Sequence, residues 1–219
     1  MKKLILFLQM IFVYPVIVFS SLHVLKSSFD LKYALLQIWA KTLLKMGNVK
    51  VLLKHQELIP LENGYVFVSS HDSSFDALSL IHCLPVSTNF IFDHREKTPY
   101  LNIWFKRLQS LYISYKESNT SLNVPQLTTL MGQHNVTIFS KNLKNQALNP
   151  EIFKIFYEMK LTLIPISIQG NSNILKKGRF HTVNVEVCLP LHHEEYLDLS
   201  YEACLKELQL RITSVKPLL

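Results

Sequence analysis

The sequence is poor in glycine, cysteine and charge. Five glycines occur in 219 residues, and they form neither a Gly-rich phosphate loop nor the GxSxG turn of a serine hydrolase. The three cysteines (Cys83, Cys188 and Cys204) show neither a disulfide framework nor a zinc-binding spacing, so we expect a reducing compartment. Charged residues make up 18% and apolar residues 48%, which excludes a disordered tail and favours membrane contact. We expect no bound metal and no cofactor.

The positive charge is concentrated at the start of the chain. Residues 1–60 hold eight lysines against Asp30 and Glu57, a net charge of +6, whereas the remainder carries +1. A nucleic-acid-binding protein would place arginines and aromatic residues together in its folded part, so we expect no nucleic-acid partner. Lysines beside the most apolar segment are typical of contact with anionic lipid.

Residues 4–22 form the first apolar segment, LILFLQMIFVYPVIVFSSL, preceded by Lys2 and Lys3. As a helix these residues would reach about 28 Å, close to the thickness of the hydrocarbon core of a bilayer. Pro15 weakens this helix as a membrane span, because a proline inside a helix frees a carbonyl and bends the axis. The alternative is a secretory signal, for which Val18 and Ser20 are tolerable cleavage positions.

The second segment, LKYALLQIWAKTLLKM at residues 31–46, predicts an amphipathic helix. Gln37, Lys41 and Lys45 form a polar stripe opposite leucine and tryptophan, which is the pattern of a helix lying in a membrane interface. A helix packed on a soluble core fits the same pattern. Together with the first segment, it leads us to expect an N-terminal membrane-associated helical segment over residues 1–46.

Residues 47–219 alternate between strand and helix patterns and predict an α/β domain. The expected strands cover residues 49–53, 65–69, 89–92, 111–115, 136–139, 161–168 and 183–188; the expected helices cover residues 74–83, 100–108, 124–133, 150–159 and 195–213. This alternation predicts a largely parallel central sheet flanked by helices. Ligand sites in such sheets lie beyond the carboxyl ends of the strands.

A histidine and an aspartate follow the second expected strand in VFVSSHDSSFDALSL. His71 precedes the expected helix and Asp76 lies in its first turn, so the carboxylate can reach back to hold the imidazole in one tautomer. In the alternative interpretation, Ser73 and Asp76 form a capping box and His71 is a loop residue. The spacing alone leaves both interpretations open.

The segment SSHDSSFDALSL resembles the first signature block of the glycerolipid acyltransferases, whose usual form is N-H-x-S-x-x-D before a helix. His71, Ser73 and Asp76 match this block, and Ser70 replaces the asparagine. Further blocks are similar in FDHREKTPYLNIWFKRLQSLYISYK and in LTLIPISIQG, and the two leading segments are similar to the membrane-docking helices of bacterial members. The third block, usually F-P-E-G-T-R, reads Phe139 to Lys144 here, with Lys141 in place of the glutamate.

The resemblance implies a fold, an activity and a set of site residues. It implies a membrane-associated acyltransferase at the cytoplasmic face of the cell membrane, acting on 1-acylglycerol-3-phosphate or a related lysophospholipid. The acyl donor would be acyl-CoA or acyl carrier protein, His71 the general base and Asp76 its orienting carboxylate. The expected substrate-binding residues are Ser73, Arg95, Lys97, Lys144 and Pro165. Because Lys141 reverses a charge, a catalytically impaired lipid-binding relative is the main alternative. A secreted hydrolase is a third hypothesis, but it lacks a convincing nucleophile.

Overall fold

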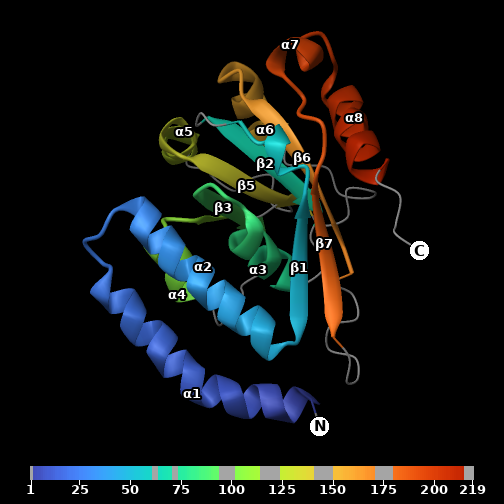
Figure 1. Ribbon diagram of the computed structural model, residues 1–219. Coiled ribbons are helices and arrows are strands. Elements are labelled where there is room, and N and C mark those ends of the chain that lie inside the picture. Colours follow the sequence, from blue (N-terminus) through green and yellow to red (C-terminus); the bar gives the residue numbers. More distant parts are fainter. Residues whose placement is uncertain are drawn as a thin grey trace.

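The computed structural model describes residues 2–60, 64–70, 74–93, 102–113, 124–140, 150–170 and 180–214. A central sheet carries helices on both faces (Figure 1). The helices are α1 (Lys2–His23), α2 (Phe29–Met46), η1 (Gln56–Leu58), α3 (Ser74–Cys83), α4 (Asn102–Arg107), α5 (Val124–Gln133), α6 (Pro150–Glu158), α7 (His193–Tyr196) and α8 (Tyr201–Thr213). The strands are β1 (Val49–Lys54), β2 (Tyr65–Ser70), β3 (Thr88–Asp93), β4 (Leu111–Ile113), β5 (Asn135–Ser140), β6 (Thr162–Gln169) and β7 (His181–Val187).

The seven strands form one sheet in the order β1-β7-β6-β2-β5-β3-β4. All neighbouring strands are parallel except β6 and β7, which are antiparallel. The expected α/β class with a largely parallel sheet is therefore confirmed. Because β1 runs parallel to β7, both strands oppose the other five. β1 thus begins at the edge of the sheet where β2 ends, and α2 leads directly into that edge.

The sheet separates two hydrophobic cores, and the alternation of side chains along β2 shows how. Phe67 faces the core that is covered by α1 to α4, whereas Val66 and Val68 face the core that contains residues of α5, α6 and α8. The first core also holds Trp104 and Phe105, both fully buried.

The N-terminal helices contribute side chains to the first core. Ile17 and Val24 near the end of α1 are buried, as are Tyr33, Leu36 and Leu44 of α2. Pro15 lies inside α1, which continues through it, and the axis of α1 is visibly curved in Figure 1. The division of the chain at residue 46 stays a prediction.

The helix predicted over residues 195–213 is wrong, because two helices occupy that region. The hydroxyl of Ser200 accepts a hydrogen bond from the backbone N–H of Ala203 and caps α8, so the chain must leave helical geometry just before it. His192 and Glu195 form a capping box that starts α7. Residues 192–195 are thus a helix start, and His193 is buried against Tyr196.

Candidate active site at the carboxyl edge of the sheet

The candidate site begins where β2 ends. β2 lies between β5 and β6, with Ser69 opposite both Phe139 and Ile166. The hydroxyl of Ser69 is fully buried and donates to the carbonyl oxygen of Ile166 at 3.2 Å, so it fixes the end of β2 against β6. The segment that carries His71 therefore leaves the sheet from a rigid position between two parallel neighbours.

Asp76 is the predicted site residue that the structure places most clearly. It lies in the first turn of α3, six residues after the end of β2, and its side chain is 2% exposed. A carboxylate is rarely buried unless a partner stabilises it. Its position places a buried carboxylate just beyond the carboxyl end of β2.

The other predicted site residues lie outside the described residues, with one exception. His71, Ser73, Arg95, Lys97 and Lys144 belong to segments that the structure does not describe. The strands before these segments are described, and their register is informative. β2, β5 and β3 are mutually parallel, and the three segments follow their carboxyl ends. The five residues therefore belong to segments that leave the same edge of the sheet, and their roles stay predictions.

Pro165, the exception, lies within β6 rather than at its end. It is buried opposite Val68, and its carbonyl oxygen accepts a hydrogen bond from the backbone N–H of Cys188 at 2.9 Å. Because proline has no N–H, the reciprocal bond to Cys188 is missing. Regular pairing of β6 with β7 stops at Ile166 and Val187. In the structure Pro165 shapes this ladder, and its predicted contact with substrate stays a prediction.

Sequence reasoning missed an aromatic cluster beneath this edge. Phe90 and Phe92 of β3 pack with Phe139 of β5 and Phe105 of α4, with ring centroids 4.6–6.2 Å apart. Phe92 and Phe139 each occupy the last position but one of their strands. Stacked, fully buried rings give the carboxyl edge a rigid floor. The period-two spacing of Phe90 and Phe92 was the available signal.

His82 and Cys83 lie at the far end of α3 from Asp76. Burial lowers the pKa of His82, and the nearby Lys41 lowers it further. Burial raises the pKa of the Cys83 thiol to about 12. A neutral imidazole and a protonated thiol, both distant from the carboxyl edge, do not supply chemistry there. The described residues contain no cluster of three metal-ligating side chains.

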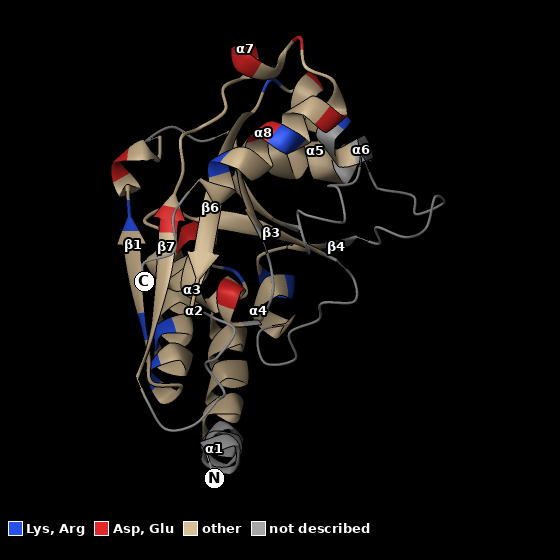
Figure 2. Ribbon diagram, turned by 90° about the vertical axis from the view of Figure 1, so that its right-hand side faces the viewer, with Lys and Arg blue, Asp and Glu red and all other residues tan. Residues whose placement is uncertain are grey.

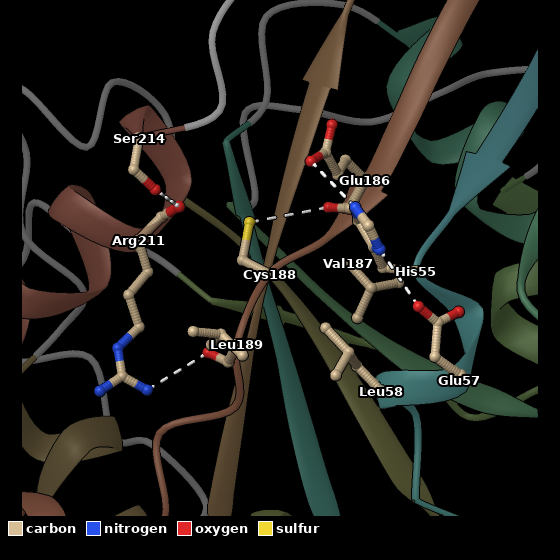
Figure 3. Close-up of a pocket in the computed structure, with 9 residues that line it drawn as sticks. All are labelled: His55, Glu57, Leu58, Glu186, Val187, Cys188, Leu189, Arg211 and Ser214. Atoms are coloured by element: carbon tan, nitrogen blue, oxygen red, sulfur yellow. Dashed lines mark hydrogen bonds and ion pairs between the residues drawn. The ribbon is translucent and has the colours of Figure 1, made fainter.

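A cavity at the opposite edge of the sheet is not part of this site. It has a volume of about 390 Å³ and is bounded by η1, the end of β7 and the end of α8 (Figure 3). His55 stands between two carboxylates there, with Nδ1 3.1 Å from Glu57 and Nε2 3.6 Å from Glu186. Because β1 and β7 are antiparallel to β2, their carboxyl ends lie at the edge of the sheet where β2 begins.

No family model matches the chain, and no curated protein matches it in sequence. The architecture, in contrast, is similar to a solved structure, the 1-acyl-sn-glycerophosphate (LPA) acyltransferase PlsC from Thermotoga maritima. The TM-score is 0.70, and the superposition covers 97% of this chain and 94% of that one, at 16% sequence identity. The chain therefore shares the fold of this acyltransferase.

This shared fold confirms the architecture that the resemblance to the signature blocks implied. The match includes the two N-terminal helices, because it covers nearly the whole chain. At this level of identity it establishes the architecture and leaves the chemistry to be argued from the residues. In this fold Asp76 occupies the start of the helix that follows β2, where the HxxxxD pattern of the sequence ends.

Proposed function

We propose that the protein is a membrane-associated acyltransferase of glycerolipid metabolism. It transfers a fatty acyl group from an acyl thioester, carried by coenzyme A or acyl carrier protein, to the hydroxyl of 1-acylglycerol-3-phosphate or a related lysophospholipid. The observation that carries the proposal is the buried Asp76 carboxylate in the first turn of α3, directly after β2, in a chain with the acyltransferase fold.

In the proposed mechanism, His71 is the general base. The acceptor hydroxyl gives its proton to the imidazole while its oxygen attacks the thioester carbonyl. The tetrahedral intermediate then collapses, the C–S bond breaks, and the departing thiolate takes the proton back from the imidazolium. Asp76 holds the imidazole in the required tautomer and stabilises its cationic form. Backbone N–H groups at the start of α3 are suited to stabilise the oxyanion, because no intrahelical acceptor uses them.

Cationic side chains would bind the phosphate of the acceptor. Arg95 and Lys97 follow β3, and Lys144 follows β5, so all three belong to segments that leave the carboxyl edge. Lysine attracts phosphate as a point charge and lacks the bidentate geometry of arginine. With Lys144 in the place of an arginine, we propose that Arg95 and Lys97 carry a larger share of phosphate binding.

The N-terminal helices support the membrane part of the proposal. Their outer faces are apolar: Phe12 is 77% exposed and Phe19 is 63% exposed on α1, and Ile38 is 57% exposed on α2. Lys41 and Lys45 are exposed on α2, and Figure 2 shows lysines along α2 and β1 and acidic residues on α7. Exposed apolar residues beside lysines suit a helix pair lying on an anionic leaflet, at the cytoplasmic face.

One structural finding bears on how the helices contact lipid. Among the described residues, no helix combines the length and the hydropathy that crossing a bilayer requires.

The decisive experiment compares variants of the purified protein in liposomes, with acyl-CoA and acyl carrier protein as alternative donors. His71→Ala should reduce turnover by about 10²–10⁴-fold, which is the usual contribution of a general base. Asp76→Asn should reduce it with an altered pH profile, because the imidazolium loses its counter-charge. Asp30→Asn is the matched control, since Asp30 lies in the first turn of α2 and is exposed. Undiminished turnover by His71→Ala would refute the mechanism.

A second candidate function follows from Lys141. A charge reversal at the position of the usual glutamate is also compatible with a relative that binds lysophospholipid and has lost catalysis. The double variant Lys141→Glu, Lys144→Arg separates the two. A large gain over a low but real rate indicates a weakened enzyme. Binding without product, before and after the change, indicates a lipid-binding protein.

A further inference from the structure

Three buried hydrogen-bond donors near the end of α4 have no partner. They are Nε1 of Trp104, Nε of Arg107 and Oγ of Ser110. Trp104 is 0% exposed, so its indole N–H cannot turn to water. Native proteins pair about 90% or more of their buried polar groups, and each unpaired one costs roughly 1–3 kcal/mol. Three such donors within seven residues point to a missing acceptor.

The local backbone gathers these donors on one side of the helix. Trp104 and Arg107 are three residues apart, which places them on the same face of α4. The chain then reverses at Gln109, whose φ is 59°, and the backbone N–H of Ser110 donates to the carbonyl oxygen of Phe105 at 2.8 Å. Ser110 is thereby held against the last turn of the helix.

The carbonyl oxygens at the end of the helix do not accept from these side chains and are already used by backbone donors. An arginine in a last turn commonly donates to the terminal carbonyl oxygens of its helix. Here the carbonyl oxygen of Trp104 accepts from the backbone N–H of Leu108, and the oxygens of the next two residues accept from backbone N–H groups of the reversing chain. Within the described part of the chain, Arg107 has no ion pair with a carboxylate.

The chemistry of the donors defines their ligand. An indole N–H and a guanidinium can only donate, so they require an acceptor, and the positive charge of Arg107 favours an anion. We infer that Trp104, Arg107 and Ser110 form a binding site for a phosphate-type oxyanion. Arg107 is only half-buried, which gives a ligand access from the surface, and the exposed Lys106 adds positive charge (Figure 2).

The position of the site favours a lipid head group as the source of the phosphate. α4 packs against α1, the helix whose outer face is apolar and exposed. A phosphodiester at the surface of the leaflet would therefore lie beside α4 when α1 rests on lipid. Free phosphate is the other source of the same chemistry. The site lies at the end of α4 that faces away from the carboxyl edge, so the inference does not depend on acyl transfer.

The two tryptophans of the chain allow a direct test by NMR of the ¹⁵N-labelled full-length protein in nanodiscs. The Trp39 indole N–H already donates to Ser20 at 3.0 Å, so it is an internal reference. Trp104→Phe assigns the second indole signal. Titration with inorganic phosphate, and comparison of phosphatidylcholine discs with discs containing phosphatidylglycerol, should move the Trp104 signal downfield and leave Trp39 unchanged.

Matched variants separate a built site from general attraction. Arg107→Gln should raise the phosphate or phosphatidylglycerol concentration for half-saturation by roughly ten- to a hundredfold, whereas Lys106→Gln, the same charge change one residue away, should raise it less than about threefold. A response to inorganic phosphate identifies a soluble ligand, and a response to phosphatidylglycerol alone identifies a head group. Equal effects of the two variants, or a Trp104 signal that moves with neither ligand, would overturn the inference. The assay contains no acyl donor, so its failure leaves the proposed reaction untouched.

Discussion

The indole N–H of Trp39 in α2 donates a hydrogen bond to the hydroxyl of Ser20 in α1 across 3.0 Å. The Ser20 hydroxyl in turn donates to the carbonyl oxygen of Ile17 at 2.9 Å. This short chain of bonds joins the two N-terminal helices through their side chains, and it is partly buried. The helices therefore form a braced pair rather than two independent segments.

Breaking this contact should loosen the helix pair. Trp39→Phe and Ser20→Ala should each lower the free energy of unfolding by about 0.5–1.5 kcal/mol, the usual net value of one hydrogen bond. The double variant should cost less than the sum of the two, because both changes remove the same bond. Denaturant titration in detergent micelles measures all three. Strict additivity would show that the bond contributes nothing.

The exposed phenylalanines of α1 should govern attachment to lipid. Phe12→Ser and Phe19→Ser should each weaken binding to anionic vesicles roughly tenfold, because each removes a large apolar side chain from the leaflet. Leu210→Ser on α8 is the control, since this leucine is 53% exposed at the other end of the molecule. Co-sedimentation measures the three affinities. An equal loss of vesicle affinity in all three variants would indicate nonspecific hydrophobic adsorption rather than binding through α1.

Deleting the first 46 residues is a poorer test of attachment. Tyr33, Leu36 and Leu44 of α2 are buried in the core between the sheet and helices α1 to α4. A truncated chain would therefore expose that core. Release from lipid could not then be separated from unfolding. The point substitutions leave these buried residues in place.

Two buried tyrosines should respond in opposite directions to loss of their hydroxyls. The hydroxyl of Tyr196 donates to the carbonyl oxygen of Leu161 at 2.5 Å, and burial raises its pKa. Tyr196→Phe should lower the free energy of unfolding by about 1–2 kcal/mol. The hydroxyl of Tyr33 is buried without a partner, so Tyr33→Phe should be neutral or stabilising. Thermal unfolding of the two variants gives the comparison, and a destabilised Tyr33→Phe would reveal a hidden partner.

Substitution by alanine should have opposite effects on stability at two glycines, Gly170 and Gly132. Gly170 follows β6 with φ of 99°, and a Cβ there would collide with the carbonyl oxygen of Thr182. Gly170→Ala should cost about 1–3 kcal/mol and disturb the carboxyl edge. Gly132 lies inside α5 with open space around it, so Gly132→Ala should stabilise the fold by about 0.5–1 kcal/mol. If Gly170→Ala is as well tolerated as Gly132→Ala, Gly170 does not have this positive φ and close contact with Thr182 in solution.

Much of the sheet was predictable because its strands are short apolar runs bounded by polar residues. β2, β3 and β5 were placed to within a residue or two in this way. The reversed direction of β7 was not predicted, although the chain offered a signal. Only eleven residues separate Gln169 from His181, which is short for the crossover that a parallel neighbour needs. The break before α8 was missed because Ser200 was not recognised as a cap.

The site was predictable only in part, for a different reason. Asp76 follows from a motif whose spacing is local, because β2 and α3 are adjacent in sequence. The proposed phosphate-binding residues come from segments after two different strands, β3 and β5, and their mutual geometry depends on how those segments fold together. The unpartnered donors of Trp104, Arg107 and Ser110 could not be predicted from the sequence, since a missing partner is a property of the packed structure.

The direction of β1 sets which edge of the sheet lies beside the end of α2. Because this edge strand opposes β2, α2 enters the sheet at the edge from which the segment containing His71 departs. A one-chain lipid that diffuses sideways in the leaflet would then need to raise only its polar end to be modified. Had β1 pointed the other way, α2 would have entered the sheet at the opposite edge, away from the segment that contains His71.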